Sequence, residues 1–143
     1  MCWGDYRPRQ FHLARQADRR TSFYPNVWDV FGGHVEPGES RERTLQRELQ
    51  EELGIVPTAW RYLETLRDMD TIKGAGLTCH FYVVTDWSGT PKNMAPQEHS
   101  DISWYRFEEV TQLELAHPVY IRIFQNAKSL LERSENRYRN GSA

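Results

Sequence analysis

The chain is short and slightly acidic, with 143 residues, 18 Lys and Arg, 20 Asp and Glu, and a formal net charge of −2 at pH 7. A chain of this length buries most of the surface that its unfolded form exposes, so we expect a single domain over residues 1–143. The charge balance argues against a protein that follows a nucleic-acid polymer, because such proteins present a net basic face. It is compatible with a small anionic ligand that a metal ion holds.

Cysteine usage and apolar runs give no sign of secretion or membrane insertion. Cys2 and Cys79 are the only cysteines and lie outside any CxxC pair, so we expect neither a disulfide framework nor a thiolate zinc site. The start, MCWGDYRPRQ, lacks an apolar signal segment, and no run of about eighteen apolar residues occurs. We therefore expect a cytoplasmic protein without membrane contact.

Two strands and a helix are expected in the first part of the chain. The strands lie near Phe11–Ala14 and Val27–Phe31, and Gly32-Gly33 ends the second strand at a sharp bend. A helix follows over Ser40–Leu53, because its first residue suits an N-cap and Gly54 supplies a C-terminal stop.

Three more strands and a second helix are expected in the rest of the chain. The strand-like segments are Trp60–Arg67, Leu77–Thr85 and Ile102–Tyr105. The last helix begins around Pro118, since proline suits the first helical position. Its apolar stripe, which predicts a buried face, consists of Val119, Ile123, Ala127 and Leu131, with Phe124 and Leu130 beside it. We expect the polar tail from Arg133 onward to fray.

Three carboxylates gather on one side of the first helix. Glu48, Glu51 and Glu52 stand at i, i+3 and i+4, so they share an arc of about 100°. Like charges this close repel one another unless water solvates them or a cation bridges them, and hard divalent ions prefer oxygen ligands. A solvated acidic face is the alternative for an isolated ExxEE pattern.

The context of this cluster is more specific than the cluster alone. The stretch GHVEPGESRERTLQRELQEELGI resembles the Nudix box, whose pattern is G-x5-E-x7-R-E-U-x-E-E-x-G-U with U an aliphatic residue. Every constrained position is met, by Gly33, Glu39, Arg47, Glu48, Leu49, Glu51, Glu52, Gly54 and Ile55. The segments LAR, WDVFGG and EHSDISWY also resemble the surroundings of the box in Nudix hydrolases.

The resemblance implies an α/β fold, a Nudix-type α/β/α sandwich around a mixed central sheet. The order of the expected strands and helices agrees with that fold. One departure concerns residues 1–10, which are polar where members of the family usually carry a longer apolar strand. Because Pro8 suits the interior of a sheet poorly, we expect this first strand to be shortened, replaced or missing.

The resemblance also implies roles for individual residues. The carbonyl of Gly33 and the carboxylates of Glu48, Glu51, Glu52 and Glu98 are similar to metal ligands of the family, with Mg²⁺ as the expected ion and Mn²⁺ as its alternative. Arg47 is similar to a residue that pairs with a box carboxylate and orients it, and Glu39 is similar to a supporting acid near the start of the helix. A carboxylate takes the proton of the attacking water, and we rank Glu48 before Glu52 and Glu98 for that role.

Residues that contact the substrate are less clearly marked. Arg15 resembles a basic residue that contacts phosphate, although a solvated surface arginine fits as well. Trp28, with Phe23 and Tyr24, offers a stacking face for a base, although aromatics at this point are more often core. The remaining candidates, His34, His80, His99 and His117, form no metal-ligand spacing such as HxxxH, so we interpret all four as non-catalytic.

The function implied by the resemblance is metal-dependent hydrolysis of a phosphoanhydride bond. The leading hypothesis is a nucleoside triphosphate, with 8-oxo-dGTP as one candidate, cut to the monophosphate and pyrophosphate. One alternative is a nucleoside diphosphate linked to another group, such as ADP-ribose or a nucleotide sugar. A second alternative is a Nudix module that senses a nucleotide without cutting it. The expected partner is the small-molecule nucleotide, and homodimers are common in the superfamily.

Overall fold

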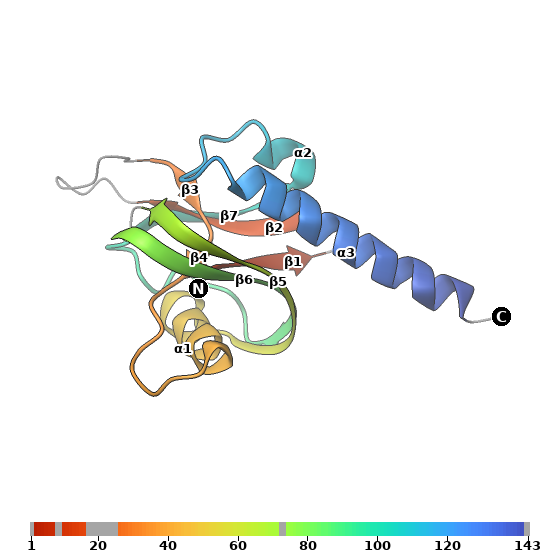
Figure 1. Cartoon of the computed structure of the whole chain (residues 1–143), viewed down its shortest axis with the longest axis horizontal. Coiled ribbons are helices and arrows are strands. Elements are labelled where there is room, and N and C mark those ends of the chain that lie inside the picture. Colours follow the sequence, from red (N-terminus) through yellow and green to blue (C-terminus); the bar gives the residue numbers. More distant parts are fainter. Residues whose placement is uncertain (1, 8–9, 17–25, 72–73, 142–143) are drawn as a thin grey trace.

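A curved sheet lies between two helices in the computed structural model of the chain, which describes residues 2–7, 10–16, 26–71 and 74–141. Helix α1 lies on one face of the sheet and the long helix α3 on the other (Figure 1). The elements are β1 (Cys2–Arg7), β2 (Gln10–Gln16), β3 (Trp28–Asp29), β4 (Phe31–Gly32), α1 (Arg41–Leu53), β5 (Val56–Thr71), β6 (Gly74–Ser88), β7 (His99–Arg106), α2 (Phe107–Val110) and α3 (Tyr120–Asn140).

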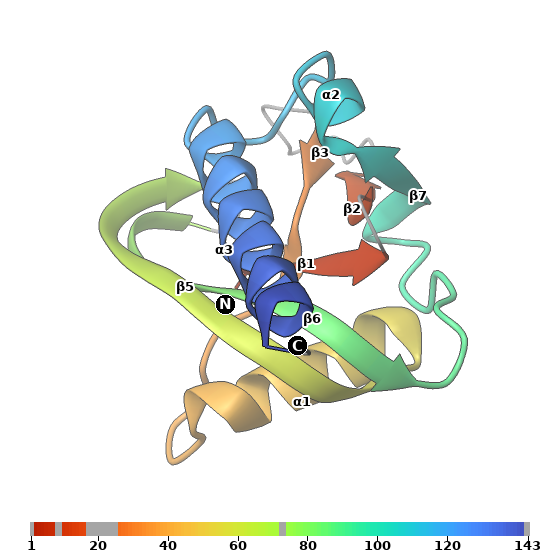
Figure 2. The same cartoon turned by 90° about the vertical axis from the view of Figure 1, so that its right-hand side faces the viewer.

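The sheet is mixed, as predicted. Its main path runs β3-β2-β1-β6-β5, with β4 paired to β1 and β7 paired to β2. Strands β1 and β6 are parallel, and the other pairs are antiparallel. The hairpin of β5 and β6 is much longer than the expected segments and curves around the side of the molecule (Figure 2). The α/β/α arrangement expected from the sequence is therefore present.

The expectation of a missing first strand is wrong, whereas its shortening relative to the family stays a prediction. Residues Cys2–Arg7 form β1, which pairs with β6 along one edge and with β2 and β4 along the other. The backbone of such a strand is hydrogen-bonded on both sides, so pairing with distant segments overrides the polar character of its sequence. Pro8 lies outside the described residues, after the last residue of β1, and so do Phe23 and Tyr24.

Local signals at both ends of α1 explain its bounds. The Ser40 hydroxyl accepts a hydrogen bond from the backbone N–H of Arg43 at 3.2 Å, which caps the start of the helix. Gly54 adopts a φ of 67° and donates its N–H to the carbonyl of Gln50, which ends it. Buried leucines of α1 then pack with Phe31 and neighbouring strands; they are Leu45, Leu49 and Leu53.

The last helix is longer than the sequence predicted. Its buried face agrees with the expected stripe and includes Ile123, Phe124, Ala127 and Leu131. The expected fraying from Arg133 stays a prediction, although α3 continues through this segment to Asn140. Ser134 accepts a hydrogen bond from Arg61 of β5 at 2.9 Å, and basic residues in the last turn interact favourably with the helix dipole.

Among the described residues, no helix combines the length and apolar character that crossing a membrane requires.

Candidate active site

The bend between β4 and α1 brings two carboxylates of the helix against the glycine pair. The backbone N–H of Gly32 donates a hydrogen bond to Glu52 Oε2 at 3.1 Å, and Glu52 is only 5% exposed. A Cβ atom added to Gly33 would overlap the carboxylate of Glu48. A side chain at position 33 would therefore require the Glu48 carboxylate, the far end of a flexible side chain, to move from this position.

Arg47 connects the loop before α1 to the carboxylates on the helix. Its Nε and Nη2 donate to the two oxygens of Glu39 at 2.8 and 2.9 Å, in a bidentate pair. Its Nη1 donates to Glu48 Oε1 at 2.7 Å and, more weakly, to Glu51 at 3.4 Å. Its Nη2 also donates to the carbonyl of His34 at 3.0 Å. The predicted orienting residues thus lie together, and Glu51 is the most exposed of the three helix carboxylates.

These contacts shift the titration of Glu39 and Arg47 in opposite directions. Hydrogen bonds from Arg47 and then from Thr44 lower the pKa of Glu39 to about 2. The hydrogen bond to Glu39 raises the pKa of Arg47 above its usual range. Both groups are therefore charged near neutral pH, and the bend carries a fixed positive group among its carboxylates.

A fourth carboxylate reaches the site from the loop that precedes β7. Glu98 and His99 offer ligand atoms that lie, together with one of Glu52, within 4.8 Å of one another. His99 is 3% exposed, and its Nε2 lies 3.9 Å from Glu52 Oε1. The sequence prediction placed Glu98 near the metal but passed over His99. We call Glu48, Glu51, Glu52 and Glu98 the carboxylate site.

The missed histidine has a simple explanation. His99 follows Glu98 directly, so it belongs to no spacing that marks two ligands on one helix face. Its position depends on β7, which pairs His99 with Gln16 of β2, and on the ring of Phe31, which contacts the imidazole edge-on. In the sequence, the one feature that pointed to His99 as part of the site was its position directly after Glu98 in EHSD.

The donor atoms of the carboxylate site suit a hard divalent cation. Four carboxylates and the nearby backbone of Gly33 offer oxygen atoms, and oxygen is the ligand atom that Mg²⁺ and Mn²⁺ prefer. Glu52 and His99 are buried, which is costly for charged groups unless a partner of opposite charge lies close. The residues present therefore fit a cation at this bend.

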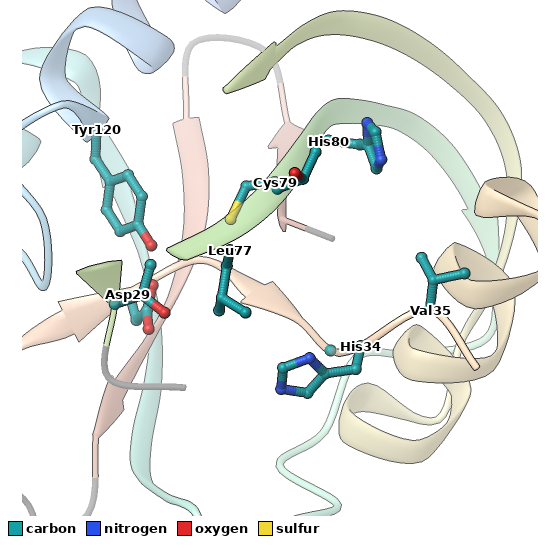
Figure 3. Close-up of a pocket in the computed structure, with 10 residues that line it drawn as sticks. Asp29, His34, Val35, Leu77, Cys79, His80 and Tyr120 are labelled. Carbon is teal, nitrogen blue, oxygen red and sulfur yellow. The ribbon is translucent and has the colours of Figure 1, made fainter. Parts of the chain in front are cut away.

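A cleft of about 320 Å³ opens beside the carboxylate site (Figure 3). Gly33 lines this cleft and also contacts Glu48, so the two sites share a wall. The lining comes from four separate parts of the chain, namely Asp29, then Gly33, His34 and Val35, then Thr71, Leu77, Thr78, Cys79 and His80, and finally Tyr120.

The two residues predicted to contact the substrate do not line this cleft. Arg15 is an exposed residue of β2 and pairs with Trp28 and Asp101 in the sheet. The Trp28 ring meets the ring of Tyr105 edge-on, with 5.0 Å between centroids, and packs against the core on the α3 side. The neighbour of Trp28, Asp29, faces the cleft instead.

His80 lines the cleft, and its contacts define which ring nitrogen carries the proton. Arg41 at the start of α1 donates from Nη1 to Nδ1 of His80 at 3.2 Å, and Thr65 lies 2.8 Å from the same nitrogen. Burial, and then the charge of Arg41, lowers the pKa of His80. Since arginine only donates, Nδ1 is an acceptor and the neutral ring carries its proton on Nε2.

The fold defines the chain as an α/β protein whose first helix presents a cluster of glutamates at the bend after β4. A family model described as NUDIX domain matches residues 4–127. Because this match covers most of the chain, the chain belongs to the NUDIX domain family, and the resemblance found in the sequence is confirmed.

Individual relatives agree with the family. The CTP pyrophosphohydrolase of Escherichia coli strain K12 is 37% identical over 90 residues, which span 63% of this chain and 63% of that protein. The nucleoside triphosphatase NudI of the same strain is 30% identical over 110 residues, 72% of this chain and 77% of that protein. The solution structure of the E. coli ORF135 protein matches with a TM-score of 0.72 and 31% identity, covering 90% and 86% of the two chains.

Proposed function

We propose that this chain hydrolyses a nucleoside triphosphate to the nucleoside monophosphate and pyrophosphate, with a divalent cation as cofactor. The observation that carries the proposal is the convergence of Glu48, Glu52 and Glu98 on the bend at Gly32-Gly33. Relatives support the triphosphate as substrate, since two of them are named a CTP pyrophosphohydrolase and a nucleoside triphosphatase.

The carboxylate site holds the cation in this proposal. Glu48, Glu51, Glu52 and Glu98 provide carboxylate oxygens, and Gly33 provides its carbonyl. Mg²⁺ is the proposed ion and Mn²⁺ its alternative. When bound, the cation neutralises phosphate charge and favours in-line attack by water.

The protein's own residues position the reaction and move the proton. Arg47 orients Glu48 through a 2.7 Å hydrogen bond, and the Gly32 N–H orients Glu52. One carboxylate accepts the proton of the attacking water, with Glu48 proposed first, then Glu52 and Glu98. The position of Gly33, in the lining of the cleft and beside the Glu48 carboxylate, supports binding of the substrate next to the carboxylates.

The test is chromatographic identification of the products from a panel of compounds, with Mg²⁺ and after its removal by a chelator, since a triphosphate yields pyrophosphate whereas ADP-ribose or a nucleotide sugar yields a nucleoside monophosphate and a sugar phosphate. The panel contains CTP, dGTP, 8-oxo-dGTP, ADP-ribose, a nucleotide sugar and a dinucleoside polyphosphate. Magnesium-dependent pyrophosphate release from a triphosphate supports the proposal. Cleavage of ADP-ribose or the nucleotide sugar alone replaces it with the diphosphate alternative. No turnover, with tight nucleotide binding by the folded protein, replaces it with a sensing role.

The same proposal places the enzyme in a reducing compartment, the cytoplasm. Cys79 is a buried cysteine that is 5% exposed and lines the cleft. Oxidation of such a thiol would introduce polar atoms into a tightly packed wall. Retention of activity in a reducing buffer and its loss after peroxide treatment are the expected results.

A further inference from the structure

The cleft has a buried acid at one end. Asp29 is 4% exposed and lines the cleft, with Leu77 and Cys79 between it and His80 (Figure 3). The Tyr120 side chain points with its hydroxyl end toward Asp29. A ligand that reaches this end of the cleft therefore meets a carboxylate that is shielded from solvent.

The carboxylate of Asp29 restricts the chemistry of its ligand. Its Oδ1 accepts a hydrogen bond from the backbone N–H of Val30 at 2.8 Å, which fixes the direction of the group. A carboxylate offers up to about four acceptor positions and no donor, so a ligand group that lies against it has to be a donor. A ligand that presents a carbonyl oxygen there would place two acceptors against each other in a buried position, which costs free energy.

The middle of the cleft suits a flat, largely apolar group. Leu77 and Cys79 lie along β6, and Gly33 also lines the cleft but adds no side chain to it. Apolar walls with a few fixed polar groups are the usual composition of a small-molecule site. A nucleobase has this shape, with polar groups only on its edges.

The other end of the cleft provides a donor. Nδ1 of His80 is occupied by Arg41 and Thr65, and among the described residues no contact is made by Nε2. The Nε2–H of the neutral ring is therefore available to a ligand acceptor. The cleft therefore offers an acceptor at Asp29 and a donor at His80. A base that carries both an amino group and a carbonyl group matches this arrangement, with the amino group at Asp29 and the carbonyl at His80.

We propose that the cleft binds the base of the nucleotide and that Asp29 selects bases with an exocyclic amino group over bases with a carbonyl in its place. Cytosine is then favoured over uracil, since the two differ by an amino group and a carbonyl at one ring position. The inference rests on the proposed hydrolysis, because Gly33 connects the cleft to the carboxylate site.

Kinetics on a matched pair of substrates test the selection. We expect kcat/KM for CTP to exceed that for UTP by about tenfold or more, the usual discrimination when a buried polar group is left unmatched. Asp29→Asn offers a donor as well as an acceptor, and it is expected to remove most of this preference by improving UTP. The control is Asp86→Asn, because Asp86 makes the same contact with the next backbone N–H but is exposed and lies outside the cleft.

Binding to the metal-free protein separates this inference from the hydrolysis. CMP is expected to bind more tightly than UMP to the wild type and to Asp86→Asn, and Asp29→Asn is expected to lose that difference. Hydrolysis of triphosphates with an unchanged CTP-to-UTP ratio in Asp29→Asn would overturn the inference alone. Without hydrolysis of any triphosphate, the proposed function fails, and the CMP and UMP affinities still decide whether Asp29 reads the base.

Discussion

The carboxylate site and the cleft share Gly33, yet the chain builds them in different ways. Three of the four glutamates of the carboxylate site lie on one helix, within five consecutive residues. The cleft takes its lining from β3, the loop at 33–35, the β5–β6 hairpin and the start of α3. The chemistry of the proposed reaction is thus encoded locally, whereas the selection of a base depends on segments that only the fold brings together.

This difference predicts two kinds of mutant. Changes in the carboxylate site would weaken the hold on the proposed cation or remove the proposed proton acceptor, so they are expected to lower kcat. Changes in the cleft alter ground-state binding of the base, so they act on KM and on the ratio between substrates. A cleft variant that lowered kcat for every substrate equally, or a carboxylate variant that changed base preference, would break the distinction.

The largest effect is expected for Glu52→Gln. The substitution removes one charge from the donor set with little change in volume, and we expect kcat to fall by about two orders of magnitude or more. The melting temperature should stay within a few degrees of wild type. Glu42→Gln is the control, because Glu42 is exposed on the same helix outside the site. Turnover near that of the wild type would contradict the assigned site.

A smaller loss is expected for Arg47→Lys, which keeps the charge but not the forked contact. Lysine has one ammonium group, so it replaces only part of the hydrogen bonds to Glu39 and Glu48. We expect kcat to fall by about tenfold, as for other residues that orient ligands of a metal. If kcat stays unchanged while the protein loses stability, Arg47 acts on folding and not on the orientation of Glu48.

In the cleft, two substitutions of His80 differ in one hydrogen bond. His80→Phe removes the Nε2–H donor and is expected to raise KM by about five- to tenfold with kcat retained, the effect of one hydrogen bond. His80→Gln keeps a donor amide at a similar reach and should stay closer to wild type. Equal KM values for both variants would show that the donor does not contact the nucleotide.

The smallest effect concerns stability in acid. The pKa of Glu39 falls from 4.5 to about 2 because Arg47 hydrogen-bonds its ionised form. A lowered folded-state pKa stabilises the protein above the unfolded value, and this contribution disappears as the pH falls from about 4.5 toward 2. Glu39→Gln should therefore flatten the melting temperature over that window, as followed by circular dichroism. A variant with the same acid dependence as wild type would exclude Glu39 as its source.

The parts of the structure that the sequence predicted are those with local signals. Ser40 and Gly54 mark the two ends of α1, and each makes the predicted capping contact. The leucine stripe of α1 and the apolar stripe of α3 are buried as their spacing indicated. The pattern of the Nudix box also lies within one continuous segment, so the sequence alone indicates the family.

The missed parts depend on contacts between distant residues. Strand β1 is polar in sequence and forms because β6, β2 and β4 pair with both of its edges. His99 reaches Glu52 only because β7 aligns with β2. Asp29 stands beside Trp28, the residue that the sequence favoured for substrate contact, yet only Asp29 lines the cleft. Tertiary packing determines which of these residues line the site and the cleft, and a short sequence pattern does not contain that information.

The guanidinium of Arg47 has a consequence for the loop between Gly33 and α1. It donates hydrogen bonds to the carbonyl of His34 at the start of this loop and to the carboxylate of Glu39 at its end, so one side chain connects the two ends of the loop. Closing a short loop carries a modest entropic cost, which these bonds offset much as a covalent cross-link would. The guanidinium of Arg47 thus both neutralises neighbouring carboxylates and holds the two ends of the loop together. A single substitution at position 47 would remove both interactions.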